Sequence, residues 1–224
     1  MELKGKIINF LGDSITEGAG VVNPENRYDN RLLRLLDLAE VRNYGIGGTR
    51  LAHQEKPSDV PQYDLCFCGR AYRMNSVADV VLVYGGVNDY MHGDAYFGKM
   101  SDRTPDTFCG AVEFLMNLLR ELYPQATIAF LTPAHVCLGG DTDDTRPFPG
   151  EMKKPDAKPL ADYVRVIEEK GRAHGIPVLN LYEKMPIAPN RSEDRERYTM
   201  DGLHFNDAGH EILANLVAEF LRAL

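Results

Sequence analysis

The feature that most constrains this chain is an alternation of short apolar runs with longer amphipathic segments. The runs read KIINFLG, VRNYG, DVVLVYGG, TIAFLTP and IPVLNL. Between them, apolar residues recur every three or four positions, which is the spacing of one helix face. Strands that alternate with helices form parallel sheets, because a crossover must join successive parallel strands. We therefore expect an α/β fold: a three-layer α/β/α sandwich around a flavodoxin-like parallel sheet of five strands.

One of the clearest predicted helices covers residues 105–123. Seven apolar side chains recur in it at helical spacing and form one buried face. Thr104 is expected as its N-cap, with Pro105 at the first helical position and Pro124 as the stop. The segment therefore predicts a helix that packs on one face of the sheet.

Three more segments have helical spacing. The C-terminal one is expected to begin at Asn206 or Asp207 as its cap, and the others lie at residues 31–40 and 160–174. The runs DVVLVYGG and TIAFLTP are almost entirely apolar, as expected of strands that helices cover on both faces. Together these patterns favour helices on both sides of the sheet.

Length and composition favour one domain over residues 1–224. A chain of 224 residues with 44% hydrophobic positions is long enough for one substantial core. No internal repeat or Ser/Gly linker marks a boundary. The longest stretches of loop composition are 133–156 and 185–200, and loops of that length often bind ligands or act as lids. The sequence leaves open whether these two loops close over a ligand.

The charge balance excludes some classes of partner. The chain has 25 Lys and Arg against 33 Asp and Glu, a formal net charge of −8, and no basic run. We therefore expect no nucleic-acid or membrane partner, since both attract basic surfaces. The first apolar stretch is interrupted by Gly12 and Asp13, so it does not resemble a signal peptide. No apolar run approaches the ~18 residues of a membrane span, and we expect a soluble, cytoplasmic protein of undetermined oligomeric state.

No metal or cofactor site is predicted. The cysteines at 66, 68, 109 and 137 lack zinc-finger spacing and are interpreted as reduced structural thiols. The six histidines show no His-Glu-x-x-His pattern. A Gly-x-Gly-Gly run at 45–48 lacks the third glycine and the acidic residue of a dinucleotide fold, and no phosphate-binding Gly-Lys-Ser/Thr follows a strand.

Four polar blocks follow the predicted strands or precede the last helix. They are Gly-Asp-Ser-Ile-Thr at 12–16, Asn-Tyr-Gly-Ile-Gly-Gly-Thr at 43–49, Gly-Gly-Val-Asn-Asp at 85–89 and Asp-Gly-Leu-His at 201–204. Open parallel sheets bind ligands at the carboxyl ends of their strands, so these blocks should meet at one edge. In this order they resemble the SGNH (GDSL-type) hydrolase family from about residue 7 to the last helix. The departures from its commonest spellings are conservative or apolar.

The first and last blocks predict a nucleophile and its base. A serine hydroxyl needs a base within hydrogen-bond reach and a third group that orients this base. Ser14, His204 and Asp201 fit these roles, because one turn would let the Asp201 carboxylate reach one imidazole nitrogen while the other faces Ser14. Taken alone, Gly-Asp-Ser would more often be a turn. Asp13 and Asp89 are expected to fix local turns rather than to act in catalysis.

The two middle blocks predict donors for an oxyanion. Attack on an ester places negative charge on the carbonyl oxygen, which preorganised N–H groups stabilise. The expected donors are the backbone N–H groups of Ser14 and Gly48 and the side-chain amide of Asn88, and the resemblance implies the same three. Gly45 and Gly47 are alternatives to Gly48, which we prefer because it lies five residues after an asparagine, as in the family's Asn-x-x-x-x-Gly block.

The chain is therefore expected to be a GDSL-type serine esterase that cleaves small carboxylic esters through an acyl-Ser14 intermediate. The resemblance covers enzymes that act on acetylated sugars, lipids, thioesters and aryl esters. We favour short acyl chains such as acetyl esters of carbohydrates, because polar segments suggest a cleft unlike a lipid tunnel. These segments surround Arg50, Arg70, Tyr72, Arg73, Tyr90 and Arg191. The alternative is that these side chains are solvated surface residues, in which case they do not indicate a cleft. An acyltransferase or a non-catalytic binding domain stays an alternative.

Overall fold

The computed structural model describes residues 2–140, 143–150 and 153–224. Its sheet has five parallel strands in the order β2-β1-β3-β4-β5, which confirms the predicted flavodoxin-like arrangement. The strands are β1 (Ile7–Gly12), β2 (Glu40–Gly45), β3 (Val80–Tyr84), β4 (Thr127–Leu131) and β5 (Val178–Leu179). The last strand is shorter than the predicted run IPVLNL, since only two of its residues pair with β4.

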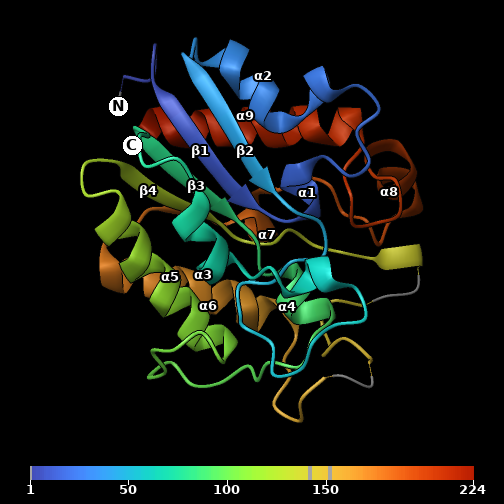
Figure 1. Ribbon diagram of the computed structural model, residues 1–224. Helices are drawn as coiled ribbons and strands as arrows, with labels where there is room; N and C mark the ends of the chain where they lie inside the picture. The colour runs from blue at the N-terminus through green and yellow to red at the C-terminus, as the bar shows by residue number, and fades with distance from the viewer. Residues whose placement is uncertain (1, 141–142, 151–152) are drawn as a thin grey trace.

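Helices cover both faces of the sheet and form the outer two of three layers (Figure 1). Helices α2 and α9 lie together on one face, and α3, α5 and α6 lie on the other. The helices are α1 (Ser14–Glu17), α2 (Tyr28–Leu35), α3 (Phe67–Arg70), α4 (Val87–Met91), α5 (Phe108–Leu122), α6 (Leu160–His174), α7 (Leu181–Lys184), α8 (Ser192–Tyr198) and α9 (Asp207–Ala223). Short 3₁₀ turns lie at Pro24–Asn26, Pro61–Asp64, Ala71–Arg73 and Leu138–Gly140.

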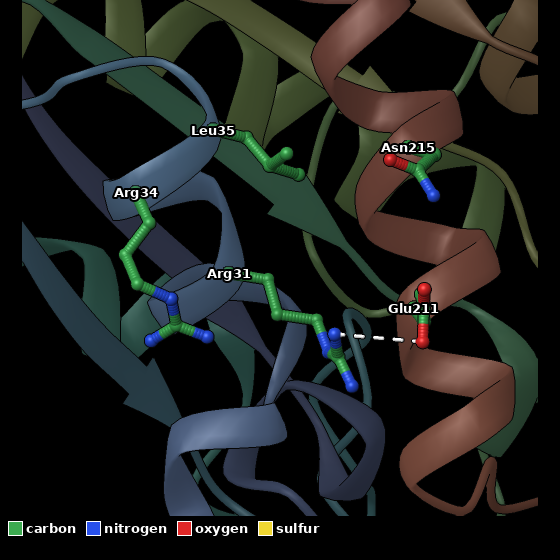
Figure 2. Close-up of a pocket in the computed structure, with 5 residues that line it drawn as sticks. All are labelled: Arg31, Arg34, Leu35, Glu211 and Asn215. Carbon is green, nitrogen blue, oxygen red and sulfur yellow. Dashed lines mark ion pairs between the residues drawn. The ribbon is translucent and has the colours of Figure 1, made fainter.

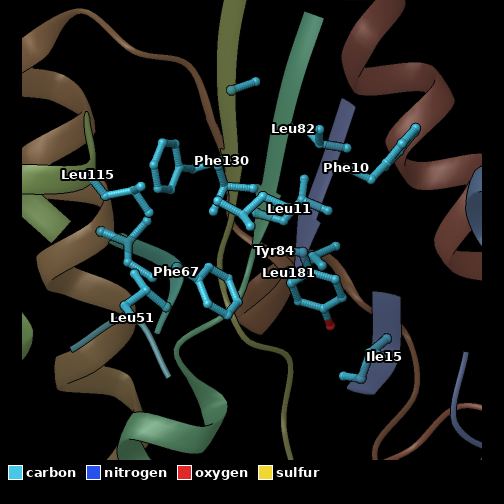
Figure 3. Packing of buried hydrophobic residues seen from close by; sticks show 14 of the residues in the cluster. Phe10, Leu11, Ile15, Leu51, Phe67, Leu82, Tyr84, Leu115, Phe130 and Leu181 are labelled. Carbon is cyan, nitrogen blue, oxygen red and sulfur yellow. The ribbon is translucent and has the colours of Figure 1, made fainter. Parts of the chain in front are cut away.

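The core lies on both sides of the central strands. Every residue of β3 is buried, as its continuous apolar run predicts. Phe10 of β1 faces α2, where its ring meets Tyr28 with 5.6 Å between centroids. On the opposite side, Phe67 of α3 and Leu115 of α5 pack against the sheet (Figure 3). Fully burying a side chain of this size contributes about 1.5–3 kcal/mol, so the two layers anchor the strands firmly.

The N-terminus of α5 differs from the prediction. The helix begins at Phe108 and not at Pro105, and its N-cap is Thr107, whose Oγ1 accepts a hydrogen bond from Gly110 N at 3.1 Å. Thr107 itself is extended and forms a bridge with Tyr96, and Phe108 N donates to the carbonyl of Tyr96 at 2.9 Å, which pairs the start of the helix with a neighbouring segment. Thr104 is therefore not the cap: tertiary pairing selects the second of two competent threonines.

The segment predicted as a helix over 31–40 is also shifted. Helix α2 begins at Tyr28 and ends at Leu35. Asp37 then has φ of 51°, a left-handed conformation that stops a helix, and Glu40 already belongs to β2. The other helical predictions agree better: α6 spans 160–174, and α9 is capped by Asn206, whose Oδ1 accepts from two backbone N–H groups.

The register of the three central strands brings their loops to one level. Gly12 at the end of β1 pairs with Gly45 of β2 and with Tyr84 of β3. The loops after these strands therefore begin side by side at the carboxyl edge, where α1 and α4 also lie (Figure 1). The cysteines are free and buried. None of the helices in the described part of the chain is long and apolar enough to cross a membrane.

Candidate active site

Ser14 is the first residue of α1, directly after β1. The Asp13 carboxylate caps this helix by accepting a hydrogen bond from Ile15 N at 3.0 Å, which confirms the predicted local turn. The other carboxylate oxygen of Asp13 is buried and has no partner among the described residues, and burial raises the pKa of Asp13 to about 7. A short helix held in this way directs Ser14 outward from the strand end.

The loop before α9 brings His204 to Ser14. His204 Nε2 lies 2.9 Å from Ser14 Oγ, and His204 Nδ1 lies 2.7 Å from Asp201 Oδ2. The second oxygen of Asp201 accepts from the backbone N–H groups of Leu203 at 2.9 Å and His204 at 2.8 Å. The structure thus brings together the three side chains that the sequence singled out, although Ser14 and His204 are 190 residues apart.

Hydrogen bonds keep the Asp201 side chain in its charged form. Burial raises its pKa, but the hydrogen bonds from the His204 ring and from two backbone N–H groups outweigh this effect and lower the pKa to about 2. Asp201 therefore stays a carboxylate at any pH near neutral. A carboxylate in this position fixes the tautomer of His204 with its proton on Nδ1, which leaves Nε2 free to accept a proton from Ser14.

The predicted oxyanion donors share one property. Among the described residues, no acceptor is found for the backbone N–H of Ser14 or of Gly48, or for the second amide hydrogen of Asn88. The alternatives are occupied: Gly45 N donates to Asn43 Oδ1 at 2.8 Å, and Gly47 N donates to the Glu17 carboxylate at 2.9 Å. The unpaired N–H favours Gly48 over both.

Gly48 also needs to be glycine. Its φ is 73°, and a Cβ at this position would lie 2.0 Å from a carbon of the Tyr63 ring. A left-handed conformation and such a close approach both exclude a side chain. The turn after β2 therefore depends on this residue for its path past Tyr63.

Asn88 of α4 is held at both ends of its amide. Its Nδ2 donates to the carbonyl of Thr49 at 3.0 Å, and its Oδ1 lies 3.1 Å from His92 Nε2. On the far side of that ring, His92 Nδ1 lies 2.9 Å from Arg50 Nη1. The sequence reasoning missed His92, although its spacing of four residues from Asn88 on a helical segment was a usable signal.

Asp89 was predicted to fix a local turn, but it does not. Its carboxylate accepts from the backbone N–H groups of Leu51 at 2.9 Å and Ala52 at 3.0 Å, which lie 38 and 37 residues earlier in the chain. Burial raises the pKa of Asp89, while the two backbone hydrogen bonds oppose this effect. Asp89 thereby ties the loop after β2 to α4, so the turn that carries Gly48 and the helix that carries Asn88 are held together.

The arginines and tyrosines expected around a polar cleft do not line one together. Arg50, Arg70 and Tyr90 are buried, and Arg70 donates to the carbonyls of Tyr44, Gly12 and Leu65. The remaining three are exposed: Tyr72 and Arg73 are solvated, and Arg191 pairs with Asp194 at 2.5 Å. The prediction that these residues surround a polar cleft was wrong. A buried guanidinium can donate hydrogen bonds to several loop carbonyls, and composition does not reveal such an arrangement.

Two cavities lie near the site. One of about 600 Å³ lies between the two long loops and is lined by His135, Val136, Cys137, Gly140, Asp143, Asp144, Thr145, Ala188, Pro189 and Asn190. The backbone of its wall is bonded to the loop that carries Asp201 and His204, since Cys137 N donates to Gly202 O and Gly139 N donates to Asp201 O, both at 2.9 Å. Of the 133–156 loop, residues 141–142 and 151–152 lie outside the described residues.

The second cavity is small and apolar. Its volume of about 10 Å³ is room for roughly one water molecule. Its lining includes Ile15, Val87 and Leu203, the chain neighbours of Ser14, Asn88 and His204. It therefore adjoins the three loops that form the site.

A third hollow lies between α2 and α9 and carries no comparable chemistry (Figure 2). Arg31 pairs there with Glu211 at 3.6 Å, and Arg34 pairs with Glu25 at 2.9 Å. Neither Ser14 nor His204 lines this groove. In the ranges that the structure describes, no group of three or more His, Cys, Asp or Glu side chains could hold a metal ion.

A comparison with family models supplies the family. The model of the GDSL-like Lipase/Acylhydrolase family matches residues 10–212, which is most of the chain and includes all four polar blocks. The chain belongs to this family. As a GDSL-type serine esterase, it takes small esters as its class of substrate. None of the curated proteins to which the sequence was compared matches it significantly.

Solved structures agree with the GDSL-type fold over the whole length. One crystal structure is 31% identical, covers 100% of this chain and 99% of its own, and has a TM-score of 0.85. A protein from Lactobacillus plantarum is 26% identical, with 99% and 98% of the two chains covered and a TM-score of 0.78. An acetyl xylan esterase is 21% identical, with 95% and 98% covered and a TM-score of 0.60, so its likeness concerns the fold alone.

Proposed function

We propose that this protein hydrolyses short-chain acyl esters, with acetyl groups on carbohydrates as the preferred substrates, through an acyl-Ser14 intermediate. The observation that carries the mechanism is the His204 ring, with one nitrogen 2.9 Å from Ser14 Oγ and the other 2.7 Å from the Asp201 carboxylate. Both distances are typical of hydrogen bonds. Together the two contacts give Ser14 a base, His204, whose tautomer is fixed.

The reaction has two halves. Ser14 Oγ attacks the ester carbonyl and His204 Nε2 takes its proton, after which the tetrahedral intermediate expels the alcohol, which receives that proton from His204. A water then attacks the acyl-enzyme while His204 takes its proton, and the carboxylic acid leaves as the proton returns to Ser14 Oγ. In each half, the unpaired N–H groups of Ser14, Gly48 and Asn88 stabilise the negative carbonyl oxygen.

The small apolar cavity supports the preference for acetyl. It has room for about one methyl-sized group, and its walls come from the residues next to Ser14, Asn88 and His204. We place the methyl group of the acyl chain there. A longer acyl chain would have to displace buried side chains such as Ile15 and Val87, which close packing resists.

The larger cavity supports a polar alcohol group. Its lining mixes the Asp143, Thr145 and Asn190 side chains with apolar ones, and the ring of His135 lies 3.7 Å from that of Tyr182. A sugar can donate hydrogen bonds to such oxygens. The solved acetyl xylan esterase with this fold agrees with an acetylated carbohydrate as the substrate class.

The test is hydrolysis of nitrophenyl esters from acetate to octanoate by the wild type, Ser14→Ala and Val136→Ala. We expect the wild type to be fastest on acetate, Ser14→Ala to be inactive with an unchanged fold, and Val136→Ala to shift the preference toward propionate and butyrate because it enlarges the small cavity. Acetylated xylooligosaccharides then test the alcohol group.

Any of three results would contradict the proposal. Full activity of Ser14→Ala would remove Ser14 from the mechanism. A wild-type preference for octanoate over acetate would show that the small cavity does not receive the acyl chain. Transfer of acetyl to added xylobiose in preference to water would reassign the enzyme as an acyltransferase.

A further inference from the structure

A chain of hydrogen-bonded polar groups leads from the buried Arg50 through the partly buried His92 to the Asn88 amide. Arg50 Nη1 lies 2.9 Å from His92 Nδ1, and His92 Nε2 lies 3.1 Å from Asn88 Oδ1. Asn88 Nδ2 then donates to the Thr49 carbonyl at 3.0 Å. Arg50, Asn88 and Thr49 are each at most 4% exposed, and His92 between them is partly buried.

The direction of every hydrogen bond in this chain is determined. A guanidinium can only donate, so His92 Nδ1 must accept and carries no proton. The neutral ring then has its proton on Nε2, which donates to Asn88 Oδ1. The amide group of Asn88 is thereby oriented with its oxygen toward His92 and its nitrogen toward Thr49, and one of its two N–H groups is left for a substrate.

The charges around His92 keep the ring neutral. Burial, together with the positive charges of Arg50 and Lys153, lowers the pKa of His92 to about 4. A protonated ring would carry Nδ1–H facing the Arg50 guanidinium. Both groups would then be hydrogen-bond donors, and no hydrogen bond could form between them. The ring also packs on Tyr63 with 5.2 Å between centroids, and Tyr63 is the side chain that Gly48 passes.

Arg50 is itself firmly held. Its Nη2 donates to the Tyr63 carbonyl at 3.0 Å and lies 3.5 Å from Asp64 Oδ1. Its own backbone carbonyl accepts from Phe67 N at 2.9 Å, and the following residue, Leu51, is bonded to Asp89. The guanidinium is therefore a fixed reference point and not a mobile surface group.

We propose that His92, anchored by Arg50, is the positioning residue for the oxyanion donor: it holds the Asn88 amide with an N–H toward the reacting carbonyl. This inference rests on the proposed function, since it assigns Asn88 to the developing oxyanion. An asparagine amide that turned over would present its oxygen to a negative charge, and His92 excludes that orientation by supplying the only donor that the described residues offer to Asn88 Oδ1.

Kinetics of three variants test the proposal. His92→Phe keeps a ring against Tyr63 but has no donor, and we expect kcat on nitrophenyl acetate to fall about 10- to 100-fold with KM nearly unchanged, which is less than the about 100- to 1,000-fold loss of a whole donor. His92→Gln keeps a donor for Asn88 and an acceptor for Arg50, so it should recover most of kcat. His210→Phe is the matched control, since the ring of His210 also accepts a hydrogen bond inside the fold, from Tyr28 N at 3.2 Å, away from Asn88. It should lower Tm but leave kcat within about twofold.

A double-mutant cycle separates positioning from a general loss of structure. If His92 acts through Asn88, then adding His92→Phe to Asn88→Ala should lower kcat no further. An additive loss in the double variant would overturn the proposal, and so would wild-type kcat in His92→Phe.

A second measurement does not depend on turnover. Nitrogen NMR of the imidazole in the wild type should show His92 neutral at pH 7 with its proton on Nε2. A charged ring, or a proton on Nδ1, would overturn the inference even if the enzyme is active. A wild type that hydrolyses no ester would refute the proposed function instead, and the His92 tautomer would then decide whether the hydrogen-bond chain exists.

Discussion

At the scale of single residues, hydrogen-bond occupancy decides which groups at the strand ends are available for chemistry. Three glycines lie at or just after the end of β2, yet two of their N–H groups are bonded to Asn43 and Glu17 and only that of Gly48 is unpaired among the described residues. Asp13 and Asp89 lie next to Ser14 and Asn88, but both carboxylates are engaged by backbone N–H groups. Adjacent residues of similar type thus have different roles.

Gly48→Ala should separate a local steric effect from the general cost of a left-handed residue. A Cβ at Gly48 would meet the Tyr63 ring at 2.0 Å, whereas Gly175 has φ of 63° and no atom within 4 Å of its Cβ position. We expect Gly48→Ala to lower kcat by about 100-fold or more, as for loss of an oxyanion donor. Gly175→Ala should cost about 1 kcal/mol of stability and leave kcat unchanged. Wild-type kcat in Gly48→Ala would contradict the role of Gly48.

At the scale of elements, tertiary pairing determines where α5 begins, and an ion pair adds to its packing against α6. Helix α5 starts after Thr107 because the residues before it pair with the segment at Tyr96. The buried face of α5 predicted from its spacing is present, with ten of its fifteen residues buried. The same helix carries Glu113, whose carboxylate meets α6 through Lys170 at 2.7 Å.

The cap of α5 can be tested with two threonines three residues apart. Thr107→Ala removes the acceptor for Gly110 N, and we expect it to lower the free energy of unfolding by about 1 kcal/mol. Thr104→Ala removes no capping hydrogen bond and should cost less than half as much. Urea unfolding of both variants checks this, and a larger loss in Thr104→Ala would place the cap where the sequence alone suggested.

The Glu113 cluster predicts a dependence of stability on pH. Burial raises the pKa of Glu113, but the hydrogen bonds from Lys170 and His174 outweigh it and lower the pKa to about 2, below the usual 4.5. The stabilisation is therefore fully present above about pH 4.5 and is lost as the pH falls toward 2. Glu113→Gln should lower the free energy of unfolding by about 3 kcal/mol at pH 7, because Lys170 is left buried without its partner.

Unfolding in urea from pH 3 to pH 7 measures this effect. The difference in the free energy of unfolding between the wild type and Glu113→Gln should become smaller as the pH falls. A difference that stays constant or grows toward pH 3 would contradict the stabilising role of the Glu113 carboxylate. Asp162→Asn is the control. Its ion pair with Arg165, at 2.6 Å, also lies on α6, but Arg165 is far more exposed than Lys170. That change should cost about 0.5 kcal/mol or less.

At the scale of the whole molecule, the order of elements explains why the sheet and part of the site were predictable. The apolar period distinguishes strands from helices, and the parallel order places the ends of β1, β2 and β3 at one edge. Ser14, Asp201 and His204 were accessible to this reasoning because each lies within a short local block. The link from His92 to Arg50 was not, since this contact joins residues 42 positions apart through a fold that must already exist. That residues 1–224 form one domain stays a prediction.

The most direct test of the account is the covalent labelling of Ser14 by diethyl 4-nitrophenyl phosphate. Ser14 Oγ should attack the phosphorus and release 4-nitrophenolate, which leaves one diethylphosphoryl group per chain, and peptide mapping by mass spectrometry should locate it on Ser14. Ser14→Ala should take up none, and Ser192→Ala, which changes the first residue of α8, should be labelled like the wild type. Labelling of Ser14→Ala at the wild-type rate, or a wild type that reacts at another residue or not at all, would contradict the assignment of Ser14 as an activated nucleophile.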